Sequence, residues 1–107
     1  MLVLLAAGCG GEEPTLPADL ATQLSNRSDS AMAQLESGDV CAAREGAEVL
    51  QTKAIGAINA GRVPGDLQEE LLGHVNALLD AISCTPPEAG GAAEEARALG
   101  EWLRERS

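Results

Sequence analysis

The sequence predicts an all-α protein, an up-down bundle of roughly three to four helices in which a disulfide closes one hairpin. Its apolar residues are mostly Ala and Leu, and the chain has one Trp but no Phe or Tyr. That composition favours close helix packing over a β-sandwich. Apolar residues also recur at steps of three and four in several segments, which is the period of an amphipathic helix. At 107 residues the chain has the length of a single domain.

The helices are expected over about 17–37, 39–60, 65–84 and 90–105. The first begins at Pro17, which suits a first helical turn, and stops before Gly38, which can adopt the left-handed cap conformation. Asp39 is the expected N-cap of the second helix, which Gly61 ends. A weak region over 25–30 allows a bend in the first helix, because Ser and Asn have poor helix propensity.

The third and fourth expected helices differ in the strength of their signals. The third has the clearest periodicity, carries Cys84 at its end, and stops at Thr85-Pro86-Pro87. The fourth begins weakly after two glycines, and its docking is less well specified. Trp102 is expected to anchor it in the core, with an exposed contact for a partner as the alternative.

Cys41 and Cys84 lie near the outer ends of the second and third expected helices. The turn between these helices is centred between Arg62 and Val63, so residues whose numbers sum to about 125 should lie opposite each other in an antiparallel pair. The two cysteine numbers sum to 125. The hairpin is therefore expected to bring their side chains together at its open end.

The amino terminus is a short apolar run that ends in small residues and a cysteine, and an acidic Gly-Gly-Glu-Glu-Pro spacer follows it. The segment Ala6-Ala7-Gly8-Cys9 resembles the lipobox of bacterial lipoproteins. This resemblance implies a diacylglyceryl group on the Cys9 thiol, cleavage before Cys9, and acylation of the new amino terminus. Small residues before the cysteine suit a signal-peptidase site, and stable anchoring takes more than one acyl chain.

The resemblance divides the chain into a signal peptide over 1–8, a lipidated amino terminus with a flexible linker over 9–15, and a helical domain over 16–107. The family carries Lys or Arg before its apolar region, and this sequence has neither there. Either the signal peptide is truncated and the true start lies upstream of Met1, or the match is accidental. The implied location is the extracytoplasmic face of a bacterial membrane, with membrane lipid as a partner through acylated Cys9.

The number of cysteines supports the same hairpin. Three cysteines are an odd number, and lipidation of Cys9 leaves Cys41 and Cys84 as one pair. An exported chain lies in oxidising surroundings, where such a pair forms a disulfide. The alternative is two buried free thiols. The combination of lipobox, acidic spacer and stapled Ala/Leu helices is similar to small lipoproteins of high-G+C bacteria, and this similarity transfers no active site.

Composition and motifs argue against several classes of function. A net charge of −10 disfavours nucleic acid as a partner, because phosphates need basic contacts. His74 is the only histidine and lies ten residues before Cys84, about 15 Å along a helix, too far to share a metal with it. The sequence has no phosphate-binding loop, calcium loop or nucleophile elbow. We expect no enzyme, cofactor or metal.

Three hypotheses of function follow. The first is an anchored helical scaffold or protein-interaction module of the cell envelope. Its candidate contact residues, Asn59, Arg62 and Pro64, lie in the turn between the second and third expected helices, although a simple chain reversal is the better explanation of this turn. The second is a carrier of a small apolar ligand or lipid. The third is a thiol–disulfide redox protein that uses Cys41 and Cys84.

Overall fold

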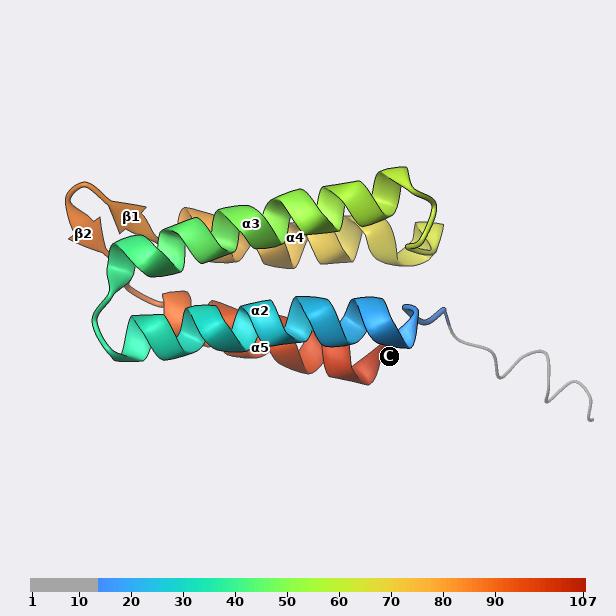
Figure 1. The fold of residues 1–107 in the computed structure, drawn as a ribbon, viewed down its shortest axis with the longest axis horizontal. Helices are drawn as coiled ribbons and strands as arrows, with labels where there is room; N and C mark the ends of the chain where they lie inside the picture. Colours follow the sequence, from blue (N-terminus) through green and yellow to red (C-terminus); the bar gives the residue numbers. More distant parts are fainter. Residues whose placement is uncertain (1–13) are drawn as a thin grey trace, which may run out of the picture.

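Four antiparallel helices make up most of residues 14–107, the part of the chain that the computed structural model describes (Figure 1). The helices are α2 (Ala18–Glu36), α3 (Val40–Asn59), α4 (Gly65–Asp80) and α5 (Ala92–Glu105). A short antiparallel hairpin of β1 (Ser83–Cys84) and β2 (Pro87–Glu88) connects α4 to α5. The predicted all-α class is confirmed, and the bundle has four helices.

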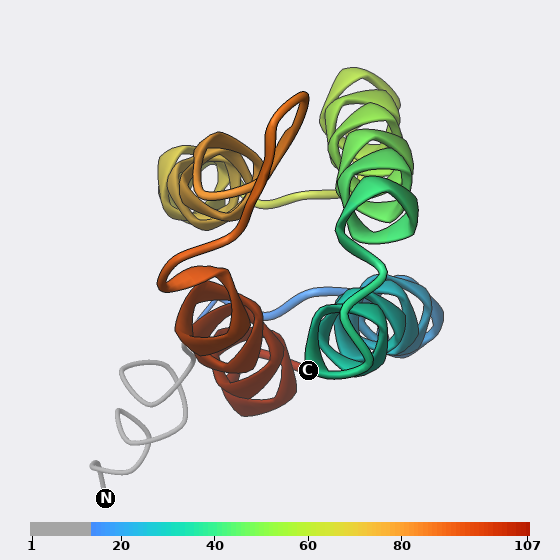
Figure 2. The ribbon, with the colours of Figure 1, turned by 90° about the vertical axis from the view of Figure 1, so that its left-hand side faces the viewer.

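The helices occupy the corners of a square when the bundle is viewed along its axis (Figure 2). Helix α2 packs against α3 and α5, and α4 packs against the same two neighbours. This up-down arrangement is the one that short connections between consecutive helices favour. The α3–α4 turn and the carboxyl terminus lie at the end where α2 begins, and the β hairpin lies at the opposite end (Figure 1).

The core fills the space between the four helices with apolar side chains that were visible as stripes in the sequence. Helix α3 contributes mainly alanines, whereas α2, α4 and α5 contribute larger side chains. Trp102 is only 7% exposed and belongs to this core, which confirms that it anchors the last helix. The largest fully buried apolar side chains are Leu24, Leu50, Leu71, Val75, Leu78, Ile82, Leu99 and Leu103.

The turns between the first three helices follow the expected chemistry. Gly38 and Gly61 have φ angles of 86° and 77°, in the left-handed region that favours glycine. The carboxylate of Asp39 accepts a hydrogen bond from the backbone N–H of Ala42 at 3.3 Å, as an N-cap residue does.

The α3–α4 hairpin has the register that the sequence predicts. The side-chain amide of Gln51 donates to the Asn76 side chain at 2.9 Å, and these two numbers sum to 127. Cys41 and Cys84 form the predicted disulfide, with their Cα atoms 4.8 Å apart. The staple therefore joins the start of α3 to the chain just beyond α4.

Helix α4 ends at Asp80, four residues before the expected end at Cys84. Cys84 instead lies in β1, where it pairs with Pro87. The β hairpin and the disulfide take up this segment instead, and the carbonyl of Ile82 accepts a hydrogen bond from Arg44 of α3 in place of one from a further helical turn. The chain turns back on itself at this point before it enters α5.

Candidate functional site: a cationic groove between two helices

Among the described residues, those expected from the sequence to carry function lie at two opposite ends of the bundle: Cys41 and Cys84 form the disulfide at one end, and the α3–α4 turn lies at the other. Cys9 lies outside the described residues. Asn59 is the exposed last residue of α3, and Pro64 is half-buried immediately before α4. Arg62 turns toward α2, where its guanidinium donates to the two carboxylate oxygens of Asp19 at 2.8 and 2.7 Å. The guanidinium of Arg62 therefore makes its polar contacts within the molecule.

This contact also changes the acidity of Asp19. The hydrogen bond from Arg62, strengthened by the positive charge of its guanidinium, lowers the pKa of the Asp19 carboxyl below its usual value. Asp19 therefore stays ionised to a lower pH than an isolated aspartate, and the pair links the start of α2 to the α3–α4 turn. Its role is structural.

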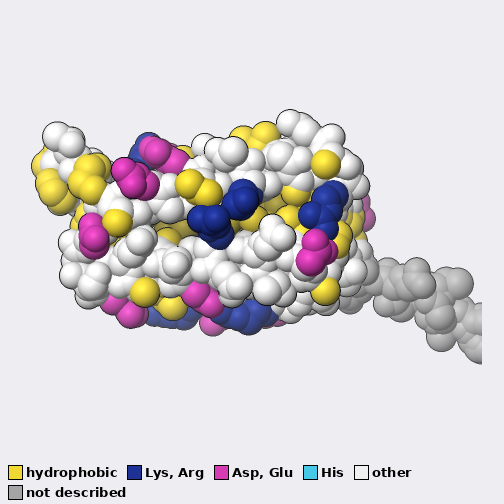
Figure 3. All heavy atoms as spheres, in the orientation of Figure 1, with side chains coloured by type: hydrophobic (Ala, Val, Ile, Leu, Met, Phe, Trp, Pro, Cys, Tyr) yellow, Lys and Arg dark blue, Asp and Glu magenta, His cyan; other side chains and the backbone are white. Residues whose placement is uncertain are grey.

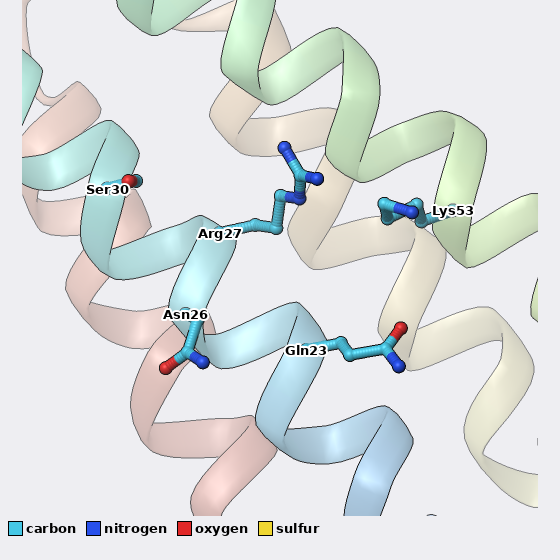
Figure 4. Close-up of a pocket in the computed structure, with 5 residues that line it drawn as sticks. All are labelled: Gln23, Asn26, Arg27, Ser30 and Lys53. Carbon is cyan, nitrogen blue, oxygen red and sulfur yellow. The ribbon is translucent and has the colours of Figure 1, made fainter.

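A groove of about 500 Å³ lies between α2 and α3, on the side of the bundle (Figure 4). Its lining comes from Gln23, Asn26, Arg27 and Ser30 on α2 and from Lys53 on α3. Arg27 and Gln23 extend from α2 toward α3, and Lys53 extends back toward α2 (Figure 4). The two cationic side chains therefore face the same space from opposite walls.

The sequence of α2 produces one wall of this groove. Gln23, Asn26, Arg27 and Ser30 are spaced by three, four and seven positions, so they form one stripe along the helix. Their neighbours Leu24 and Ala31 are buried. The stripe consequently lies next to the edge of the core and is itself exposed to solvent.

The groove lies on the face of the bundle that α2 and α3 form. In the space-filling view, basic side chains stand near the middle of this face, with apolar atoms beside them (Figure 3). The five residues that line the groove are all polar or charged, so its chemistry comes from side chains of both helices.

The charge of the groove is unusual for this protein. The chain has seven basic residues against seventeen acidic ones. Four of the seven, Arg44, Arg62, Arg104 and Arg106, form ion pairs within residues 14–107. The other three are Arg27, Lys53 and Arg97, which have no such partner within that range. Two of these three cations therefore face one another across a single groove.

Two carboxylates that lie close to the groove cations in sequence pair with other arginines. Asp29 is on α2 close to Arg27 in sequence, but it accepts a hydrogen bond from Arg104 of α5 at 2.9 Å. Glu48 on α3 accepts from Arg44 at 3.0 Å. Neither carboxylate therefore pairs with Arg27 or Lys53.

Two other surface grooves have less distinctive chemistry. One of about 450 Å³ lies along α3, is lined by Glu45, Glu48, Val49 and Thr52, and shares Lys53 with the first. One of about 370 Å³ lies between Pro14, Glu70 and Arg106. No three potential metal ligands come together among residues 14–107. Within the same residues, no helix has both the length and the apolar character to cross a bilayer.

Comparison of the chain with protein-family models, curated proteins and solved structures found no match. Sequence reasoning had not singled out Arg27 or Lys53. The polar stripe on α2 and the scarcity of basic residues were the two sequence features that could have indicated them. What could not be read from the sequence is that Arg27 and Lys53, 26 positions apart, face each other across the α2–α3 contact.

Proposed function

We propose that this protein is an extracytoplasmic lipoprotein whose helical bundle serves as a protein-interaction module without a catalytic role. Acylated Cys9 anchors it to a bacterial membrane, and the groove between α2 and α3 contacts another component of the cell envelope. The observation that carries the proposal is the groove itself. It brings together two of the three cations that lack ion-pair partners within residues 14–107, on the side of a stapled bundle.

A stiff support favours recognition over chemistry. The contacts of α2 with α3 and a core exposed by 7% or less hold the walls of the groove together. The disulfide adds a covalent link between α3 and the chain just beyond α4. Binding surfaces gain affinity when they are preorganised, because less conformational entropy is lost on association. The α3–α4 turn is less suited to contact a partner, since Arg62 already bonds Asp19.

Anchoring through Cys9 is supported by the lipobox resemblance and is compatible with the way the chain enters the bundle. Leu16 donates its backbone N–H to the carbonyl of Arg106 at 2.7 Å, so the linker meets the bundle at the end that also holds the carboxyl terminus. The chain from Cys9 to Leu16 spans at most about 25 Å when fully extended. The anchored bundle therefore stands close to the membrane, and the groove faces sideways from it.

A carrier of lipid or another apolar ligand is the second candidate, and the packing disfavours it. Such a carrier needs an apolar cavity of roughly 300 Å³ or more that encloses its ligand. Between the helices of this bundle the large side chains Leu24, Leu50 and Leu71 are fully buried against one another. A redox role is less favoured still, because the Cys41–Cys84 bond joins distant segments as a structural staple does.

Anchoring is tested by the Cys9→Ser substitution and by an inhibitor of the lipoprotein signal peptidase. The wild-type chain should incorporate labelled palmitate and fractionate with membranes, and Cys9→Ser should do neither. Inhibition should leave an uncleaved precursor. A wild-type chain that takes up no label and stays soluble would contradict the anchor.

The interaction surface is tested with a photocrosslinking amino acid in the native envelope. Placed at Gln23, in the groove, the crosslinker should capture a discrete partner. Placed at Glu101, exposed on α5, it should not, and it serves as the matched control. Equal capture from both positions, or capture from neither, would rule out the groove as the contact surface.

A further inference from the structure

We propose that the groove between α2 and α3 recognises an acidic peptide segment of the partner protein. This inference rests on the proposed interaction function and names the chemistry of its partner. The two walls bring Arg27 and Lys53 toward one space without a carboxylate between them, in a chain whose net charge is −10.

The charge pattern is the first step. Acidic residues outnumber basic ones by seventeen to seven, so a basic side chain on this surface would ordinarily find a carboxylate. Arg27 and Lys53 find none within residues 14–107, and both Asp29 and Glu48 turn to other arginines. Like charges facing each other repel, and an incoming carboxylate relieves that repulsion while it forms charge-assisted hydrogen bonds.

The shape of the groove favours a chain over a compact anion. The stripe from Gln23 to Ser30 rises about 10 Å along α2, which is the length of about three residues of extended peptide. The amide of Gln23, which extends toward α3, can both donate to and accept from a peptide backbone, and the Ser30 hydroxyl can do the same (Figure 4). Arg27 and Lys53 can bind acidic side chains of the peptide, and the neutral groups can form hydrogen bonds with the peptide backbone between those side chains.

A small phosphate ion would bind this site less well than a peptide. Proteins commonly hold phosphates with backbone N–H groups at the start of a helix. The lining residues lie in the interior of α2 and α3, where backbone N–H groups are bonded within the helix. All contacts must therefore come from flexible exposed side chains, which can follow an extended segment but do not enclose a single ion.

The test uses the full chain and a fluorescein-labelled hexaglutamate peptide, with binding followed by fluorescence anisotropy. Arg27→Gln and Lys53→Gln should each weaken binding about tenfold, because each removes one charged contact. Arg97→Gln is the matched control, since Arg97 is also an exposed cation without an ion pair in residues 14–107. It changes the net charge equally and should weaken binding less than twofold. A labelled hexalysine peptide should not bind.

Several outcomes would overturn the proposal. Equal losses for all three variants would mean that binding follows overall charge and not the groove. Competition by inorganic phosphate as effective as that by unlabelled hexaglutamate would assign the site to a small anion. Preference for vesicles of anionic lipid over hexaglutamate would assign it to a membrane surface. Absence of hexaglutamate binding would reject it outright.

A second readout separates this inference from the proposed function. Crosslinking from Gln23 is repeated in the Arg27→Gln/Lys53→Gln double variant in the native envelope. Loss of the crosslink together with loss of hexaglutamate binding supports both proposals. A crosslink that persists at full strength leaves the interaction function standing and removes the acidic segment as its basis. Hexaglutamate binding without any wild-type crosslink leaves the groove chemistry standing and removes the proposed function.

Discussion

Arg44 on α3 donates hydrogen bonds to the backbone carbonyl of Ile82 at 2.8 Å and to that of Leu79 at 3.1 Å. The last turn of α4 contains no basic residue of its own. Carbonyls at a helix end have no intrahelical partner and attract positive charge. Helix α3 therefore caps its neighbour, close to the point where the disulfide joins the same two segments.

Replacing Arg44 with Gln should lower the free energy of unfolding by about 1–2 kcal/mol, since hydrogen bonds to charged groups contribute about this much. Urea denaturation followed by far-ultraviolet circular dichroism measures the change. Glu48→Gln is the control, because it removes the ion pair with Arg44 and leaves the two carbonyl contacts in place. It should cost less than about 0.5 kcal/mol. A larger loss of stability for Glu48→Gln than for Arg44→Gln would show that the ion pair contributes more to stability than the cap does.

Cleaving the Cys41–Cys84 disulfide should destabilise the bundle strongly. The bond closes a loop with a sequence separation of 43, and the chain-entropy model assigns about 4 kcal/mol to a loop of this size. Cys84→Ser should therefore lower the Tm by about 15 °C or more. Thermal melts with and without reductant test this, and reductant should have no effect on the Cys41→Ser/Cys84→Ser variant. An unchanged Tm in reduced wild type would show that packing alone sets the stability.

Three glycines offer a matched test of backbone conformation. An added Cβ would meet nothing within 4 Å at Gly56, Gly73 or Gly61. Gly56→Ala and Gly73→Ala should each stabilise the protein by about 0.5–1 kcal/mol, because both positions lie inside helices. Gly61 has a φ of 77°, so Gly61→Ala should instead destabilise by about 1–2 kcal/mol. Denaturant midpoints compare the three, and the same sign of change at all of them would contradict this account.

The Arg62–Asp19 pair should give the stability a component that depends on pH. The pKa of Asp19 is lower in the folded state, so the pair stabilises above a pH of about 4, the usual range for an unfolded aspartate. That contribution is lost as the pH falls through the folded-state pKa. Nuclear magnetic resonance titration should show the Asp19 pKa rising toward its usual value in Arg62→Gln. Arg104→Gln, whose arginine contacts Asp29, should leave the Asp19 pKa where it is.

Much of the fold was predictable because its signals are local or symmetric. The apolar stripes, Asp39 as a cap and Gly38 and Gly61 as helix ends depend on residues close in sequence. The proximity of Cys41 and Cys84 followed from an antiparallel hairpin with a central turn, and the odd number of cysteines supported their pairing. Trp102, the largest apolar side chain of the fourth helix, lies in the core as expected.

What the sequence could not provide depends on how neighbouring helices are rotated and how long side chains are oriented. Arg44 could have pointed to solvent, and its position against Ile82 follows from the α3–α4 contact. The same is true of Arg27 and Lys53, which become one site only when α2 lies beside α3. The early end of α4 follows from the β1–β2 pairing and from the hydrogen bond of Arg44 to the Ile82 carbonyl, which are contacts that no local sequence signal indicates. Cys9 and its lipid stay a prediction from the sequence.

The hydrogen bond between Leu16 and Arg106 has a practical consequence for labelling the protein. It keeps the carboxyl terminus beside the point where the linker joins the bundle, so in a chain anchored at Cys9 a tag fused after Ser107 emerges next to the lipid headgroups. The turn at Thr85, between β1 and β2, lies at the other end of the bundle (Figure 1), roughly one helix length or 30 Å away. An epitope inserted there would project from the end of the bundle opposite the one that the linker joins.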